Sequence, residues 1–111
     1  MGVFEIEKLK ESRAFRLTGE MDLASKEAFN EALVLEIGQD GDLTLDLSGL
    51  TFIDSTGVQA LIKAAETLHE RGRLILRAPG KNVLKVFDLM RMDTAPNVQI
   101  SGRDLPEGEG R

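Results

Sequence analysis

The sequence predicts a single α/β domain built around a mixed β-sheet. Two apolar patterns indicate this fold: short runs that alternate with polar residues, as in a β-strand, and longer stretches with the three- and four-residue spacing of an amphipathic helix. The two patterns follow each other along the chain, and strand–helix–strand crossovers place neighbouring strands parallel. A length of 111 residues is that of one ordinary domain, whose core needs neither disulfides nor metal.

The first half of the chain is expected to hold a hairpin, a helix and a strand. Apolar residues within 3–6 and 14–17 flank a polar turn and predict two antiparallel strands. Residues 26–37 have helical spacing, and Ser25 is placed to cap that helix. Leucines then alternate with polar residues over 43–48, which predicts a strand with one buried face.

The second half is expected to hold two helices and two short strands. A helix is predicted over 55–72, with His69 in its last turn, where a cation favours the helix dipole. Residues 74–76 read as a short buried strand between a glycine and a Pro-Gly pair. A third helical stripe covers 83–90, and 98–100 predicts a last short strand.

Composition and charge exclude several classes of function. The absence of cysteine rules out a thiolate metal site, a cysteine nucleophile and a disulfide scaffold, and it fits the cytoplasm. A net charge of −5 with scattered basic residues argues against nucleic-acid binding. No stretch reaches the ~18 apolar residues of a membrane span, and no signal peptide is recognised. We expect a domain over 1–101 and a flexible C-terminal tail over 102–111.

The best candidate for chemistry is the place where the strand from Leu43 runs into the helix that opens with Asp54, Ser55, Thr56 and Gly57. Sites in open α/β sheets form at the carboxyl ends of strands. The free N–H groups and positive partial charge of a helix N-terminus can accommodate a phosphate on Ser55, and Gly57 keeps the first turn unobstructed. The structural alternative is that Asp54 or Ser55 is an N-cap and nothing more.

An enzymatic role for Ser55 lacks the groups that it requires. Ile53 stands where a nucleophile elbow needs glycine. His69, the one histidine, lies 14 residues further along the same predicted helix, about 21 Å away at 1.5 Å per residue. The chain has no phosphate-binding loop, so ATP must be supplied by another protein. Asp40 and Asp42 lack the remaining ligands of a calcium loop. We therefore expect no cofactor, no metal and no enzymatic activity.

Residues 45–57, with the sequence LDLSGLTFIDSTG, resemble the signature segment of STAS domains, specifically those of anti-sigma factor antagonists. The segment Gly19-Glu20-Met21-Asp22 resembles the second loop of that family, Gly-x-hydrophobic-Asp. The resemblance spans about residues 3–100. It implies a mixed sheet of four or five strands with helices mainly on one face.

The same resemblance implies a switch. Ser55 would be phosphorylated by the cognate anti-sigma factor, a serine kinase, and dephosphorylated by a PP2C-type phosphatase. The unphosphorylated chain would bind the anti-sigma factor and free the sigma factor, and phosphorylation would end that binding. The residues expected to shape the site or contact the partner are Asp54, Thr56, Gly57, Asp22, Glu20 and Met21.

Two other interpretations stay open at this point. A STAS subunit with a purely structural role, in a stress-sensing scaffold or as a lipid-transport accessory, would assemble whatever the charge at Ser55. A receiver domain would use Asp54 as the phospho-acceptor and bind magnesium, but it needs an acidic pair after its first strand, and the early loops offer no adjacent pair.

Overall fold

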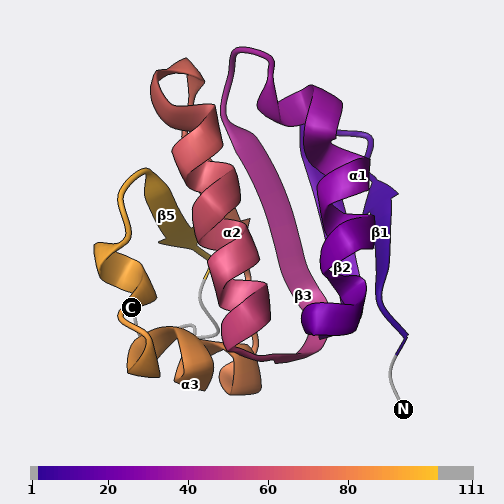
Figure 1. The fold of residues 1–111 in the computed structure, drawn as a ribbon, viewed down its shortest axis with the longest axis vertical. Helices are drawn as coiled ribbons and strands as arrows, with labels where there is room; N and C mark the ends of the chain where they lie inside the picture. Colours follow the sequence, from indigo (N-terminus) through magenta and orange to yellow (C-terminus); the bar gives the residue numbers. More distant parts are fainter. Residues whose placement is uncertain (1–2, 103–111) are drawn as a thin grey trace.

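The computed structural model describes residues 3–102 and has a five-stranded sheet in the order β1-β2-β3-β4-β5 (Figure 1). β1 pairs antiparallel with β2, and the remaining neighbours pair parallel. The strands are β1 (Glu5–Lys8), β2 (Ala14–Met21), β3 (Leu43–Ile53), β4 (Leu74–Arg77) and β5 (Val98–Ser101). The predicted mixed sheet is confirmed. Apart from Gly102, the predicted tail lies outside the described residues.

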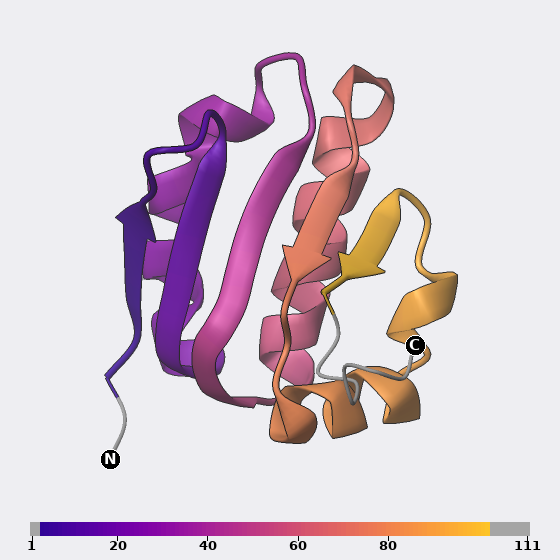
Figure 2. The ribbon, with the colours of Figure 1, turned by 180° about the vertical axis from the view of Figure 1, so that it is seen from behind.

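The helices are α1 (Lys26–Ile37), α2 (Ser55–Leu68) and α3 (Lys81–Leu89). α1 and α2 lie side by side on one face of the sheet, and α3 lies at the end where the parallel strands finish (Figures 1 and 2). Seen from behind, the strands stand in front of α1 and α2, so the opposite face of the sheet carries none of these helices (Figure 2). The expectation of helices mainly on one face is therefore confirmed.

The core lies between α1, α2 and the sheet. Alternating leucines of β3 point into it, and Leu45 pairs in register with Phe15 of β2 and Leu76 of β4, all three buried. α1 contributes Phe29 and α2 contributes its buried face. The buried face of β3, which alternates every second residue, thus packs in the same core as the buried face of α2, which has helical spacing, as the sequence pattern predicts.

The open face of the sheet carries a network of charges around Asp46. Arg16, Asp46 and Arg77 pair in register on three adjacent strands. The Asp46 carboxylate accepts a 2.8 Å hydrogen bond from the Ser48 N–H and lies 3.4 Å from Arg77 and 3.7 Å from Arg16. Burial by itself raises the pKa of Asp46, but the bonds from Ser48 and Arg77 outweigh it and lower this pKa. Two hydrogen bonds from Arg77 likewise lower the pKa of Glu11.

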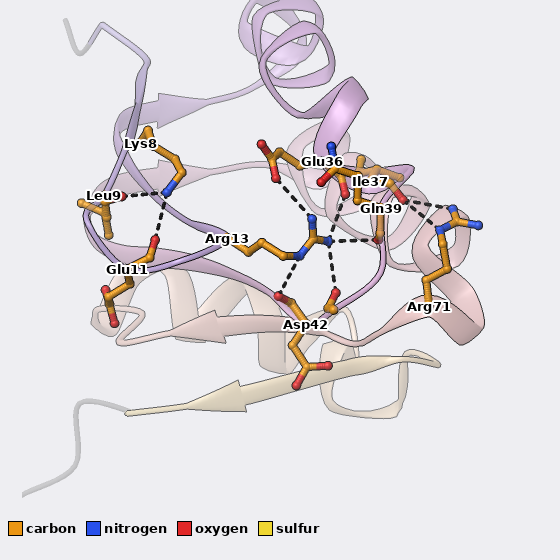
Figure 3. A network of polar contacts seen from close by, with 10 residues as sticks. Lys8, Leu9, Glu11, Arg13, Glu36, Ile37, Gln39, Asp42 and Arg71 are labelled. Atoms are coloured by element: carbon orange, nitrogen blue, oxygen red, sulfur yellow. Dashed lines mark hydrogen bonds and ion pairs between the residues drawn. The ribbon is translucent and has the colours of Figure 1, made fainter.

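Arg13 holds the loop between α1 and β3 (Figure 3). Its guanidinium donates to the main-chain oxygens of Glu36, Gln39, Gly41 and Asp42 at 3.0 to 3.3 Å, and to the Glu36 carboxylate at 3.2 Å. These bonds tie the last turn of α1 to the loop that follows it, because one guanidinium holds carbonyl groups from both. The sequence showed Arg13 only as part of a polar turn, and its partners lie more than 20 residues away.

Two details of the predicted helices are wrong. Ser25 stands at the N-cap position of α1 but makes no capping bond there, because its hydroxyl bonds Asp22 across a one-turn 3₁₀ helix that precedes α1. The second helix ends at Leu68 rather than Gly72, and a separate 3₁₀ turn follows it. There the Asn97 side chain donates to carbonyl oxygens of Ala65, His69 and Gly72 at 2.8 to 3.1 Å and so caps the helix end.

Candidate functional site

Asp54 is the N-cap of α2. Its backbone is extended, and its Oδ1 accepts a 3.0 Å hydrogen bond from the N–H of Gly57. Its main-chain oxygen accepts a 3.0 Å bond from Val58. The N-cap expected at Asp54 or Ser55 is thus Asp54, which satisfies a helix N–H that would otherwise lack a partner. Ser55 is consequently not the cap but the first residue of the helix.

The side chain of Ser55 is exposed, and among residues 3–102 no hydrogen bond holds its hydroxyl. Asp54 takes the N–H groups of Gly57 and Val58, whereas those of Ser55 and Thr56 meet no acceptor within the described part of the chain. A helix start with free N–H groups carries a positive partial charge. The Ser55 hydroxyl is therefore accessible, and an anionic group at this position would have N–H donors close by.

Gly57 lets the first turn of α2 approach the end of β2. A Cβ atom on this residue would lie 2.7 Å from Cγ1 of Ile53 and 2.8 Å from the main-chain oxygen of Met21. Both distances are shorter than van der Waals contact, and the second neighbour is backbone, which cannot rotate away. The glycine of the Asp-Ser-Thr-Gly motif is required by this close approach.

The structure brings the Glu20-Met21-Asp22 segment beside the helix start. Met21 pairs in register with Ile53, and its main-chain oxygen accepts a 3.2 Å hydrogen bond from the N–H of Asp54. Asp22 forms a capping box with Ser25, its Oδ1 accepting from the Ser25 N–H at 3.2 Å. Glu20 and Asp22 are partly exposed and lie at and just after the end of β2, next to the end of β3 that leads to Ser55.

The predicted contact between Met21 and a partner is wrong. The Met21 side chain is fully buried and belongs to the core. Its flexible thioether packs against Ile53 and the position of Gly57 instead of reaching solvent. Met21 shapes the site through its main chain and its packing.

Two exposed apolar side chains at this end of β2 and β3 were not singled out from the sequence. Leu23 directly follows Asp22 and is 70% exposed, and Phe52 pairs in register with Glu20 and is 45% exposed. Both side chains are accessible to a partner that covers this part of the surface. The available signal was position, since Phe52 lies within the segment 45–57 and Leu23 directly follows Asp22.

No group of three or more histidine, cysteine or acidic residues able to hold a metal ion is found in residues 3–102. Within the same residues, no helix is long and apolar enough to cross a membrane.

Thr56 is partly buried and lines a groove between α1 and α2 rather than standing beside the Ser55 hydroxyl in open solvent.

Comparisons with known proteins show the family and the fold of the chain. The family model described as "Mlab, STAS domain" matches residues 4–102. The crystal structure of an anti-sigma factor antagonist from Mycobacterium paratuberculosis is similar, with a TM-score of 0.74 and 20% identity over 89% of this chain and 86% of that chain. The structure of the anti-sigma factor antagonist SpoIIAA in its unphosphorylated form has a TM-score of 0.67 and 23% identity, over 97% of this chain and 92% of that one. No curated protein matches significantly.

Proposed function

We propose that this chain, which belongs to the STAS domain family, is an anti-sigma factor antagonist that binds its anti-sigma factor while Ser55 is unphosphorylated and releases it when Ser55 is phosphorylated. The observation that carries the proposal is the free, exposed hydroxyl of Ser55 at the first position of α2, beside unoccupied N–H groups. The two antagonist structures have the same fold.

The chain supplies the phospho-acceptor, and the partner binds ATP and catalyses the phosphoryl transfer. In the forward step, a serine kinase, which is the anti-sigma factor itself, transfers the terminal phosphoryl group of ATP to Oγ of Ser55. A new O–P bond forms, the bond to ADP breaks, and the hydroxyl proton is lost. A PP2C-type phosphatase hydrolyses the ester with water and restores the hydroxyl. The protein is then a cytoplasmic binding module rather than an enzyme.

The negative charge of a phosphate on Ser55 would account for the loss of partner binding. A phosphoserine adds about −1.5 to −2 charge at pH 7. The N-terminal end of α2 stabilises part of this charge, so the fold survives. Three acidic residues, Glu20, Asp22 and Asp54, already stand at this end of β2 and β3, which we call the acidic edge. An interface over this edge must desolvate the dianion beside these carboxylates. A regulatory coupling of about 1 to 3 kcal/mol, or 5- to 150-fold in affinity, is all that is needed.

Leu23 and Phe52 provide the attractive part of such an interface. Leu23, in the 3₁₀ turn after β2, is 70% exposed, and Phe52, near the end of β3, is 45% exposed. A few buried side chains near the centre of an interface contribute most of its binding energy, and an unpaired charge beside them weakens binding because it must also be desolvated. We expect the unphosphorylated edge to bury both side chains against the partner.

The second candidate is a STAS subunit with a structural role. The observation in its favour is that Asp54 and Gly57 both have a purely structural explanation, as a helix cap and as a close contact. In that case the motif requires no phosphorylation, and assembly is indifferent to the charge at Ser55.

The deciding experiment compares affinities for the candidate anti-sigma kinases encoded in the same genome. The variants are Ser55→Ala, Ser55→Asp and, as a matched control, Ser12→Asp, which adds the same charge to another exposed serine. Circular dichroism verifies folding. We expect the first variant and the control to bind like the wild type and Ser55→Asp to lose tenfold or more, about 1.4 kcal/mol.

Equal binding by all four proteins would favour the structural subunit. Binding by none of them would remove the antagonist proposal altogether. The kinase should also transfer phosphate from ATP to the wild-type chain but not to Ser55→Ala. Phosphorylation of that variant would place the acceptor elsewhere, for example at Thr56.

A further inference from the structure

The groove between α1 and α2 is a second feature of the helix layer. It consists of two adjoining hollows of about 370 Å³ and 290 Å³, both of which Asn30 and Lys63 line. Lys26, Thr56, Gln59 and Ala60 complete the first hollow, and Val34, Ile37, Ala64 and Thr67 complete the second. We call the two together the α1–α2 groove.

The chemical character of the α1–α2 groove differs from that of the chain as a whole. The chain has 19 acidic and 14 basic residues, yet none of the residues that line either hollow is acidic. Lys26 on α1 and Lys63 on α2 are exposed, and neither forms an ion pair within residues 3–102. The groove is thus a cationic strip on an otherwise acidic protein, and it is complementary to an anionic partner.

The two ends of the groove differ in polarity. Lys26 and Thr56 lie at the end where both helices begin, whereas Ile37 and Thr67 lie where both helices finish, so the helices run parallel (Figure 1). The second end is more apolar, because Val34, which is 64% exposed, lines it. Between Lys26 and Ile37 the groove extends about 16 Å, or three helical turns, at 1.5 Å per residue.

We propose that the α1–α2 groove docks an acidic amphipathic helix of the anti-sigma factor. Apolar side chains of this helix at i, i+3, i+4 and i+7 would cover Val34 and Ile37, and its carboxylates would meet Lys26 and Lys63. The partner is the one named in the proposed function, on which this inference rests. The length, the apolar end and the unpaired lysines of the groove all match such a helix.

The groove also connects with the switch. Thr56 lines the groove and is the neighbour of Ser55, so a helix that fills the groove ends beside the phospho-acceptor. A phosphate on Ser55 repels the carboxylates of that helix without having to enter the groove. Phosphorylation therefore weakens two adjacent contacts, the acidic edge and the groove.

The test measures the affinity of the anti-sigma kinase for two matched pairs of variants. Lys63→Glu reverses a charge that lines both hollows, and Lys10→Glu reverses an exposed lysine that lines neither. Val34→Glu places a carboxylate in the groove, and Leu35→Glu places one on the adjacent residue, which is 75% exposed and lines neither hollow. We expect about a tenfold loss for Lys63→Glu and Val34→Glu, and less than about threefold for the two controls. The loss in Lys63→Glu should shrink as salt is raised.

A second measurement uses the unaltered chain, so that it does not depend on any variant folding. Lysine acetylation with and without the kinase, read by mass spectrometry, should show Lys26 and Lys63 protected in the complex and Lys10 still reactive. If the wild type binds but the groove variants bind equally well and both lysines stay reactive, the inference is overturned and the proposed function stands. If the wild type binds no kinase, both are overturned. Self-association of the chain that Lys63→Glu abolishes would also overturn the inference, because the groove would then hold a second copy.

Discussion

The guanidinium of Arg77 lies 3.4 Å from the carboxylate of Asp46 on the face of the sheet that α1 and α2 leave open. The two residues pair in register on neighbouring parallel strands, so the β3–β4 alignment itself produces the contact. Arg77 also holds Glu11 from the β1–β2 turn at 2.9 Å. The pair therefore joins the hairpin to the centre of the sheet.

Stability should fall in acid because of this network. The pKa values of Asp46 and Glu11 are both lowered in the folded chain, so the unfolded chain binds more protons in the acidic range. The stabilisation is complete above the unfolded values, near pH 4, and is lost as pH falls through the folded values. Urea unfolding from pH 7 to pH 3 should show a smaller acid loss for Arg77→Gln than for the wild type. Parallel profiles would contradict this role of Arg77.

Gly57→Ala should destabilise the fold. The added methyl group would lie 2.8 Å from the main-chain oxygen of Met21, so α2 must shift away from β2. Overpacking of this kind costs about 1 to 3 kcal/mol in free energy of unfolding. Gly38→Ala is the control, since its Cβ would meet only the Leu35 oxygen at 3.7 Å. Equal urea midpoints for the two variants would refute the close approach.

Asp54→Ala should cost about 1 kcal/mol in free energy of unfolding, because it removes the oxygen that accepts from the Gly57 N–H. Asp54→Asn keeps an acceptor and should retain most of the stability. Ser55→Ala should stay within about 0.5 kcal/mol of the wild type, since the exposed hydroxyl makes no bond in residues 3–102. A larger loss for Ser55→Ala than for Asp54→Ala in thermal or urea unfolding would reverse the assignment of the cap.

Arg13→Ala should destabilise the domain by about 1 to 3 kcal/mol, since it leaves the main-chain oxygens of the loop after α1 without their donor. Arg13→Lys should recover little, because one ammonium cannot reproduce the planar fork that reaches four carbonyl groups. Amide hydrogen exchange should accelerate over 36–42 in both variants. Full rescue by lysine would show that charge alone matters there.

The elements that local patterns specify were predictable from the sequence. Alternation in β3 and helical spacing in α2 depend on neighbours within a few residues, and the structure confirms both. The end of α2 was not predictable, because Asn97, which caps it, is 25 to 32 residues away in sequence from its acceptors. Local propensity favoured a helix end at Gly72, but the contact with Asn97 accompanies an end at Leu68.

In the candidate site, too, some features follow from local sequence and others depend on tertiary contacts. The motif at residues 54–57 could be located from its place between a strand and a helix, and its N-cap follows from Asp54 standing just before the helix. The burial of Met21 could not be predicted, because it depends on the register between β2 and β3. The burial of Leu50 could not be predicted either, because this residue lies between two irregularities in the same pairing that interrupt the alternation beginning at Leu43.

The bond between the N–H of Asp54 and the oxygen of Met21 is made by main chain alone. Any residue except proline at position 54 can donate it, and any residue at 21 can accept it. The side chains at Glu20, Leu23 and Phe52 can therefore change without loosening the frame that presents Ser55. The surface around Ser55 and the frame that holds it are therefore separable, so that substitutions at these three positions can alter specificity while the scaffold stays the same.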